Sequence, residues 1–159
     1  MNNVVVDTNP LVYIYNSVSD LGEKYATLLW ELARKNILNI PKLVYGELSL
    51  IFRHCRELNA FLSDTGITIG EIKTETYITA AKRWDVYNNR RRLICQSCGT
   101  KLGKLKCKKC KYEIKIRQHI LTDFLIGAYA LEIDGRKIVT SDIGYYSSYF
   151  PELNIITVD

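Results

Sequence analysis

The sequence has few prolines and lacks any long apolar run, and both features restrict the class of protein to which it can belong. Only three of 159 residues are proline, and 47% are hydrophobic against 25% charged. This is the composition of a folded globular domain rather than of a disordered chain. No apolar run approaches the roughly 20 residues that a membrane-spanning helix needs. The amino-terminal stretch has no basic region, and Asp7 interrupts its short apolar run. We therefore expect no secretory signal, no membrane association and a cytoplasmic location.

Internal repeats and low-complexity linkers are also missing, which indicates a single domain of ordinary size with room for a small insertion. Short apolar runs alternate with amphipathic stretches, a pattern typical of an α/β fold with a parallel sheet covered on both faces. Trp30 and Trp84 lie on helical stripes and are expected in the core. The expected strands are residues 4–6, 37–40, 66–72 (the weakest), 137–142 and 154–158. The expected helices are one that starts at 8–10, then 20–36, 42–64 (one long or two short), 74–90, one from about 118 that ends at Gly135, and a short one in 143–153.

Positive charge is concentrated in one segment of the chain. Residues 82–119 carry 13 Lys or Arg and two acidic residues, a balance of +11, whereas the rest of the chain carries −6. An acidic body with one strongly basic stretch is suited to binding a polyanion. A charged face that is merely solvated is the alternative interpretation.

Four of the five cysteines form two C-x2-C pairs, Cys95 with Cys98 and Cys107 with Cys110, which are separated by eight residues. Each pair can direct two thiolates to one ion at about 2.3 Å, and two pairs complete a tetrahedral Zn²⁺ site without an open position for water. We therefore predict a structural zinc ribbon, which needs its metal because the segment is almost devoid of apolar residues. An iron–sulfur cluster and disulfides are the alternatives. The fifth cysteine, Cys55, is expected to be a small buried side chain.

Carboxylates occupy positions where a parallel sheet gathers its ligands. Asp7 follows the apolar run 4–6, Asp142 follows the run 137–141, and Asp123 lies near the start of a helix. Ligands bind beyond the carboxyl ends of parallel strands. Converging carboxylates need a cation, and oxygen ligands select Mg²⁺ or Mn²⁺. Glu47, in the helix after the second strand, is a plausible fourth ligand. Each residue alone also fits a helix cap or a turn, so the set carries the argument.

Four motifs occur in a fixed order: VVVDTNPLVY at the amino terminus, YGEL around residue 47, LTDFLIGAYALE, and IVTSDIGYYSSYFPELNIITV. Together they resemble the PIN-domain family of nucleases, over nearly all of residues 2–158 except about 91–116. The resemblance implies a PIN-like three-layer fold, and metal-dependent hydrolysis of RNA phosphodiesters with 5′-phosphate and 3′-hydroxyl products. It implies that Mg²⁺ or Mn²⁺, as one or two ions, is held by Asp7, Glu47, Asp123 and Asp142, with Thr8 and Ser141 as catalytic hydroxyls beside them.

The resemblance also implies two domains, a PIN-like nuclease domain of residues 1–90 and 117–159 and a zinc-ribbon insertion of residues 91–116. PIN nucleases of ribosomal RNA maturation carry a zinc ribbon after the core rather than within it, so no specific substrate is transferred. A basic arm rooted beside an acidic cleft would supply phosphate contacts that the cleft lacks. The expected RNA-binding residues are Arg90, Arg91, Arg92, Lys104, Lys106, Lys108, Lys109, Lys111, Lys115 and Arg117.

Several aromatic residues accompany the carboxylates. His119 lies four residues before Asp123, on the same helical face, and is either a contact to the scissile phosphate or a solvated or capping residue. Tyr145, Tyr146 and Tyr149 follow Asp142 and are expected to be core or cleft wall.

The expected function is thus a metal-dependent endoribonuclease that acts in ribosomal or other RNA processing. Its expected partners are RNA, a ribosome or pre-ribosome, and a second copy of the chain. The alternatives are a non-catalytic RNA- or ribosome-binding adaptor, a toxin-type PIN ribonuclease restrained by an antitoxin, and a nuclease that acts on DNA.

Overall fold

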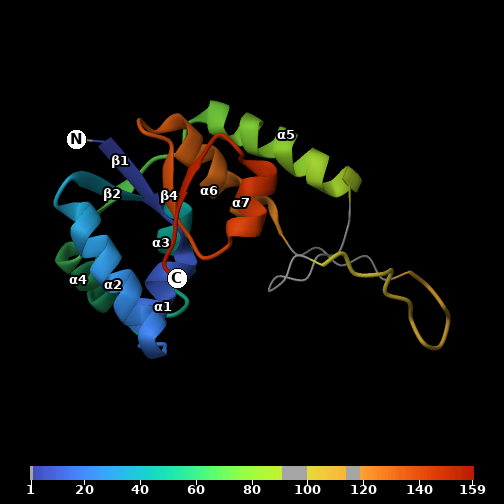
Figure 1. Ribbon diagram of the computed structural model, residues 1–159, viewed down its shortest axis with the longest axis horizontal. Coiled ribbons are helices and arrows are strands. Elements are labelled where there is room, and N and C mark those ends of the chain that lie inside the picture. The colour runs from blue at the N-terminus through green and yellow to red at the C-terminus, as the bar shows by residue number, and fades with distance from the viewer. Residues whose placement is uncertain (1, 91–99, 114–118) are drawn as a thin grey trace.

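The computed structural model describes residues 2–90, 100–113 and 119–159, and its centre is a five-stranded parallel sheet (Figure 1). The strand order is β3-β2-β1-β4-β5, and all neighbouring strands run parallel. The first strand of the sequence is therefore the middle strand of the sheet, which explains its apolar run: Val4, Val5 and Val6 are all 0% exposed. The strands are β1 (Asn2–Val6), β2 (Asn36–Pro41), β3 (Ile67–Gly70), β4 (Lys137–Val139) and β5 (Asn154–Ile156).

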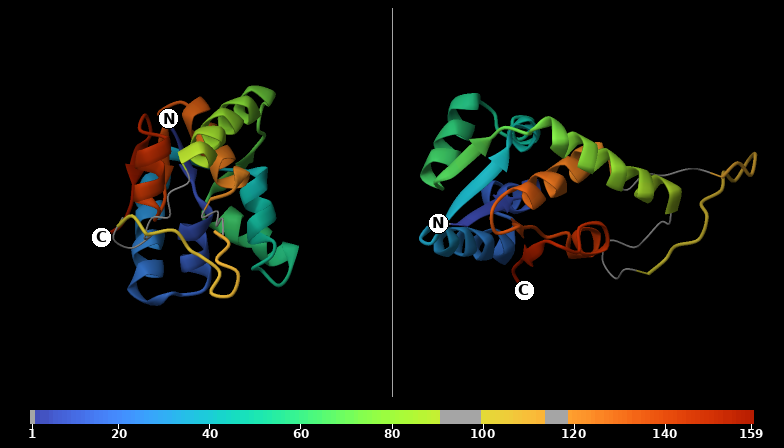
Figure 2. Two further views of the ribbon diagram at one scale, coloured as in Figure 1. Left: turned by 90° about the vertical axis from the view of Figure 1, so that its right-hand side faces the viewer. Right: turned by 90° about the horizontal axis from the view of Figure 1, so that it is seen from above.

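Helices cover both faces of this sheet. In Figure 2, α2 and α4 lie on one side of the sheet, and α5, α6 and α7 lie on the other, where Tyr145 of α7 packs against Phe124 of α6. The α/β class and the central parallel sheet predicted from the sequence are thus confirmed. The helices are α1 (Thr8–Tyr15), α2 (Ser19–Ala33), α3 (Lys42–Leu48), α4 (Cys55–Asp64), α5 (Thr74–Arg90), α6 (Leu121–Glu132) and α7 (Ile143–Tyr149).

Helix α6 lies deepest in the fold and sets the position of one site residue. All seven residues 124–130 are buried, because the helix packs under α5 and against the sheet. Gly127 allows the Phe150 ring to approach the helix closely, since a Cβ at this position would lie 2.4 Å from that ring. This packing fixes the first turn of α6, which carries Asp123.

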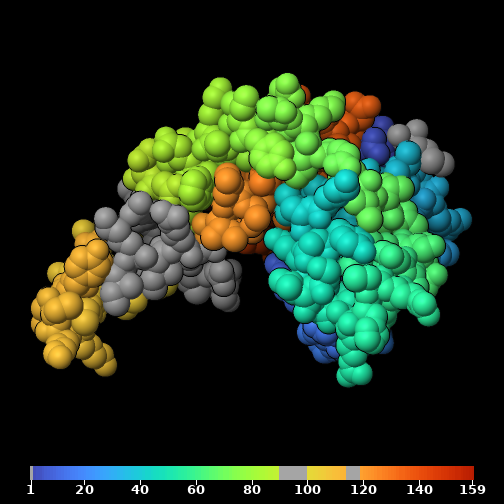
Figure 3. Space-filling view, turned by 180° about the vertical axis from the view of Figure 1, so that it is seen from behind, coloured from blue at the N-terminus to red at the C-terminus, as the bar shows by residue number. Residues whose placement is uncertain are grey.

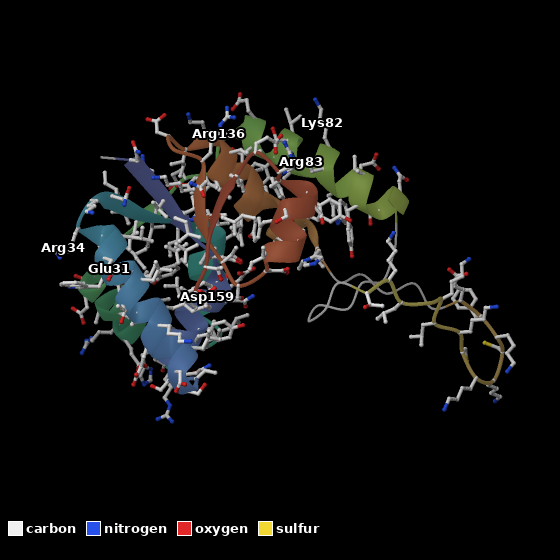
Figure 4. All side chains as sticks on the ribbon, viewed as in Figure 1. Glu31, Arg34, Lys82, Arg83, Arg136 and Asp159 are labelled. Carbon is white, nitrogen blue, oxygen red and sulfur yellow. The ribbon has the colours of Figure 1, made fainter. Side chains whose placement is uncertain are left out.

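One arginine joins α5 to the segment after α7 (Figure 4). The Arg83 guanidinium donates to the backbone carbonyl of Tyr149 at 2.5 Å, pairs with Glu152 at 2.6 Å and lies 4.8 Å from the Phe150 ring centre. A planar guanidinium suits this combination of stacking and forked hydrogen bonding. The long helix that leads toward the cysteine segment is thereby held against the body.

Two sequence expectations need correction, and one open choice is settled. Trp30 is 64% exposed, with Arg34 against its ring, because it lies on the solvent side of α2. Cys55 is exposed at the first position of α4. The stretch 42–64 forms two helices with a break at 49–54, which settles the open choice between one helix and two. Trp84, in contrast, is partly buried and packs against the core.

Residues 100–113 stand away from the sheet and its helices, as Figure 3 shows from behind. Within the described residues, no helix is long and apolar enough to cross a bilayer.

Candidate active site

The site lies beyond the carboxyl ends of β1 and β4, which are adjacent in the sheet. Asp7 directly follows β1 and caps α1, because its Oδ1 accepts a hydrogen bond from the Thr8 backbone N–H at 2.8 Å. Its Oδ2 accepts a second from the Thr140 hydroxyl at 2.7 Å. Only 7% of Asp7 is exposed.

The same Thr140 hydroxyl connects the two aspartates that follow these strands. Its Oγ1 accepts a hydrogen bond from the Asp142 backbone N–H at 3.0 Å while its O–H donates to Asp7. Asp142 in turn caps α7, with Oδ1 accepting from the Tyr145 N–H at 3.2 Å. Thr140 was not singled out from the sequence; its place directly after an apolar strand is the signal that was available.

The two hydroxyl residues expected beside the carboxylates have different surroundings. The Thr8 hydroxyl donates to the Glu47 carboxylate, which connects α1 to α3. The Ser141 hydroxyl lies 3.4 Å from the Tyr13 hydroxyl and is not among the residues that line the cavity. Thr8 and Thr140 therefore supply the hydroxyl groups that contact the carboxylates of Glu47 and Asp7.

Asp123 approaches from the first turn of α6 together with His119. Its Oδ2 accepts from the Ile120 backbone N–H at 2.8 Å and lies 3.5 Å from His119 Nδ1. The other ring nitrogen, Nε2, lies 3.8 Å from Asp142 Oδ2. The imidazole therefore lies between two carboxylates that come from different elements.

These side chains enclose a cavity of about 190 Å³. All four carboxylates predicted from the sequence contribute to it, although they come from four separate segments of the chain. The lining residues are Asp7, Thr8, Asn9, Glu47, His119, Asp123, Ile126, Asp142, Tyr145 and Tyr146.

The electrostatics of the cavity favour a bound cation. Burial, with smaller contributions from the charges of Asp123 and Glu47, raises the pKa of Asp7 from 3.8 to about 6, although the hydrogen bonds from Thr140 and Thr8 oppose this rise. Burial and the Asp123 charge also raise the pKa of Glu47. Like charges that are confined together and shielded from water are costly without a counter-ion.

The donor set fits a hard divalent cation, since carboxylate oxygens suit Mg²⁺ and Mn²⁺. Across residues 2–90, 100–113 and 119–159, however, no three His, Cys, Asp or Glu side chains already have the arrangement of a metal site. Several of the carboxylate oxygens accept hydrogen bonds from neighbouring threonines or from backbone N–H groups instead. Metal binding would thus require side-chain rotations at the rim of the cavity.

The described half of the predicted zinc site is a tight turn. The Cys107 N–H donates to the Tyr112 carbonyl at 2.8 Å, and the Lys111 N–H donates to the Cys107 carbonyl at 2.9 Å. Lys111 has a left-handed φ of 61° directly after Cys110. Hydrogen bonds from the backbone of Cys110 and Lys109 lower the pKa of Cys107, which favours the thiolate form that binds metal. Cys95 and Cys98 lie outside the described residues.

Five of the predicted RNA-binding lysines fall on residues 100–113, and all five are exposed; they are Lys104, Lys106, Lys108, Lys109 and Lys111. Of these, Lys104 pairs with Glu113 at 3.0 Å. The Arg90 side chain and Arg91, Arg92, Lys115 and Arg117 lie outside the described residues.

A structural comparison defines the class of fold. The chain is similar to a chain in the crystal structure of VapBC2 from Rickettsia felis bound to a DNA fragment from its promoter, with a TM-score of 0.64, 19% identity and 99% of each chain covered. Neither a protein-family model nor a curated protein matches the sequence. At this identity the likeness establishes the fold alone, a PIN-like parallel sheet with flanking helices.

Proposed function

We propose that this protein is a metal-dependent endoribonuclease that hydrolyses RNA phosphodiesters in the carboxylate cavity. One observation carries the proposal: Asp7, Glu47, Asp123 and Asp142 line a single cavity although they are spread over 136 residues of sequence. A merely structural role does not require four carboxylates to converge where ionisation of Asp7 is already unfavourable.

The residues around the cavity have separate roles in such a reaction. A divalent ion, when bound, supplies the Lewis acid for the scissile phosphate and the attacking water. Thr140 orients the Asp7 and Asp142 segments, and Thr8 orients Glu47. Hydrolysis in this sense leaves a 5′-phosphate and a 3′-hydroxyl.

The second part of the proposal is that Cys95, Cys98, Cys107 and Cys110 bind structural Zn²⁺ and that the lysines around them bind RNA. The spacing of the cysteines and the turn from Cys107 to Lys111 support the zinc site. The exposure of the arm lysines supports phosphate contacts, because an acidic cavity gains little affinity for a polyanion by itself.

Cleavage of end-labelled RNA tests the first part. Single-stranded RNA, structured RNA and DNA of the same sequence are incubated with Mg²⁺ or Mn²⁺ and wild type, Asp7→Asn or the exposed control Asp20→Asn. We expect RNA cleavage that needs the added ion, persists in Asp20→Asn and disappears in Asp7→Asn. Uncleaved RNA with well-folded, zinc-loaded wild type would contradict the proposal and favour an RNA-binding adaptor. Cleavage of DNA alone would change the substrate class, and growth arrest on expression would favour the toxin-type alternative.

A further inference from the structure

His119 lies in a position that the four-carboxylate scheme does not account for. Its side chain is only 16% exposed and lines the cavity. The two ring nitrogens face different carboxylates, Nδ1 toward Asp123 Oδ2 at 3.5 Å and Nε2 toward Asp142 Oδ2 at 3.8 Å. Both separations exceed a hydrogen bond, so the imidazole lies beside these oxygens without being hydrogen-bonded to either.

Contacts with Tyr145 and Tyr87 hold the His119 ring in this position. It stacks on Tyr145, with ring centres 4.1 Å apart and planes at 23°. The His119 backbone N–H donates to the Tyr87 hydroxyl at 3.1 Å, and the Tyr87 ring meets the imidazole edge-on. Two elements, α5 and α7, therefore fix both the backbone and the ring plane. A histidine that was only solvated would not need this support.

The distance between His119 Nε2 and Asp142 Oδ2 is compatible with both atoms binding one ion. Neighbouring ligands on an octahedral ion with bonds of about 2.1 Å lie about 3 Å apart. The distance from Nε2 to Asp142 Oδ2 has to shorten by less than about 1 Å to reach this spacing. Asp142 is already oriented for it, because its Oδ1 is held by the Tyr145 N–H and its Oδ2 is the atom that faces the ring.

Asp123 completes the arrangement on the other side of the ring. A metal-binding histidine usually donates its second N–H to a carboxylate, which fixes the tautomer. Asp123 Oδ2 faces Nδ1, and its position is set by the Ile120 N–H. The second oxygen of Asp123 stays available to the cavity.

We infer that His119 is a nitrogen ligand of the divalent ion at this site, binding through Nε2 beside Asp142, so that the site takes Mn²⁺ in preference to Mg²⁺. Imidazole suits transition metals, whereas Mg²⁺ strongly prefers oxygen. The inference rests on the proposed function only for the location of the ion, and it concerns binding rather than cleavage.

Mn²⁺ is the probe, because it reports directly on a coordinated nitrogen through its electron spin. The chain has only two histidines, so a matched control exists: His54, which is exposed and precedes α4. Zinc-loaded wild type, His119→Gln and His54→Gln are each titrated with Mn²⁺, and nitrogen hyperfine coupling is measured by pulsed electron paramagnetic resonance. We expect imidazole coupling in wild type and His54→Gln and its loss in His119→Gln.

Affinity gives a second readout. We expect His119→Gln to bind Mn²⁺ at least about 10-fold more weakly, with less than about a threefold change for Mg²⁺. Thermal unfolding without added Mn²⁺ or Mg²⁺ checks that the variant folds, and Tyr145→Leu, which removes the stacking surface but keeps the imidazole, should retain the coupling with weaker Mn²⁺ binding. Bound Mn²⁺ without imidazole coupling in wild type would overturn the inference, as would equal losses of Mn²⁺ and Mg²⁺ affinity in His119→Gln.

The outcome is separable from that of the proposed function. Imidazole coupling that depends on His119, in a protein that cleaves no RNA, would support the inference and contradict the nuclease proposal. RNA cleavage that depends on Asp7 but shows no coupling would contradict the inference alone.

Discussion

Replacement of Asp7 by Asn should stabilise the protein while it removes the site. Asp7 is buried, and burial is the main reason that its pKa rises from 3.8 to about 6. A carboxyl group whose pKa is raised on folding binds its proton more tightly in the folded state. Its contribution to stability is therefore fully present below about pH 4 and is lost as the pH rises through about 6.

The magnitude follows from the same two pKa values. From fully protonated to fully ionised, the free energy of unfolding falls by about 3 kcal/mol. Between pH 5 and pH 8 the fall is about 1.4 kcal/mol. Asn cannot ionise, and its carbonyl can still accept the N–H of Thr8, but the Thr140 hydroxyl loses an acceptor, which costs about 1 kcal/mol. At pH 8 the variant should thus be more stable by about 2 kcal/mol.

Urea unfolding of wild type, Asp7→Asn and the control Asp20→Asn, without added Mg²⁺ or Mn²⁺, measures both quantities. The difference in unfolding free energy between wild type and Asp7→Asn should widen by about 1.4 kcal/mol from pH 5 to pH 8. Added Mn²⁺ should stabilise wild type and Asp20→Asn but not Asp7→Asn. A parallel pH dependence in all three proteins would refute the argument, because it would mean that Asp7 ionises without cost.

Three further changes test the surroundings of the site. Thr140→Val removes the donor to Asp7 and the acceptor of the Asp142 N–H; it should destabilise the fold by about 1–3 kcal/mol in urea unfolding and move the Asp7 pKa, followed by carboxyl NMR, further upward. Gly127→Ala should lower stability by about 1–3 kcal/mol despite the better helix propensity of Ala, because the new Cβ meets the Phe150 ring; an unchanged melting temperature would contradict this packing. Tyr145→Phe should raise the unfolding free energy of the protein without added Mg²⁺ or Mn²⁺ by about 1 kcal/mol, since the buried Tyr145 hydroxyl has no hydrogen-bond partner among the described residues.

The sheet and most helices could be predicted because their signals are local. An apolar run such as VVV, buried on both faces, and the stop at Asp7 are visible in a short window of sequence. The prediction that Trp30 is buried was wrong because it used only a local pattern. A stripe at helical spacing does not say which face of the helix meets the sheet, and the face that carries Trp30 meets solvent. The prediction that Cys55 is buried was wrong because the break after α3 exposes the start of α4.

The convergence of the four carboxylates on one cavity could be predicted from the sequence, whereas the residues that surround them were much harder to predict. A carboxylate at the end of a strand is a strong signal, because parallel topology brings such ends together. A threonine such as Thr140 becomes informative only when β1 and β4 are known to be neighbours. The contact of His119 with Asp142 likewise depends on the position of α7 against α6, which no sequence window contains.

The position of the basic cysteine segment in the chain relates the charge distribution to the carboxylate cavity. The segment leaves the body after α5 and returns just before His119, and the Tyr87 hydroxyl joins α5 to the backbone of His119 at 3.1 Å. The described residues Tyr87 and His119, which flank the segment in sequence, are therefore joined in space, and His119 lines the carboxylate cavity. Under the proposed function, residues 82–119, which carry +11 against −6 for the rest of the chain, supply the phosphate attraction that the acidic cavity lacks. An insertion elsewhere in the chain would supply the same net charge without bringing a polyanion to the four carboxylates.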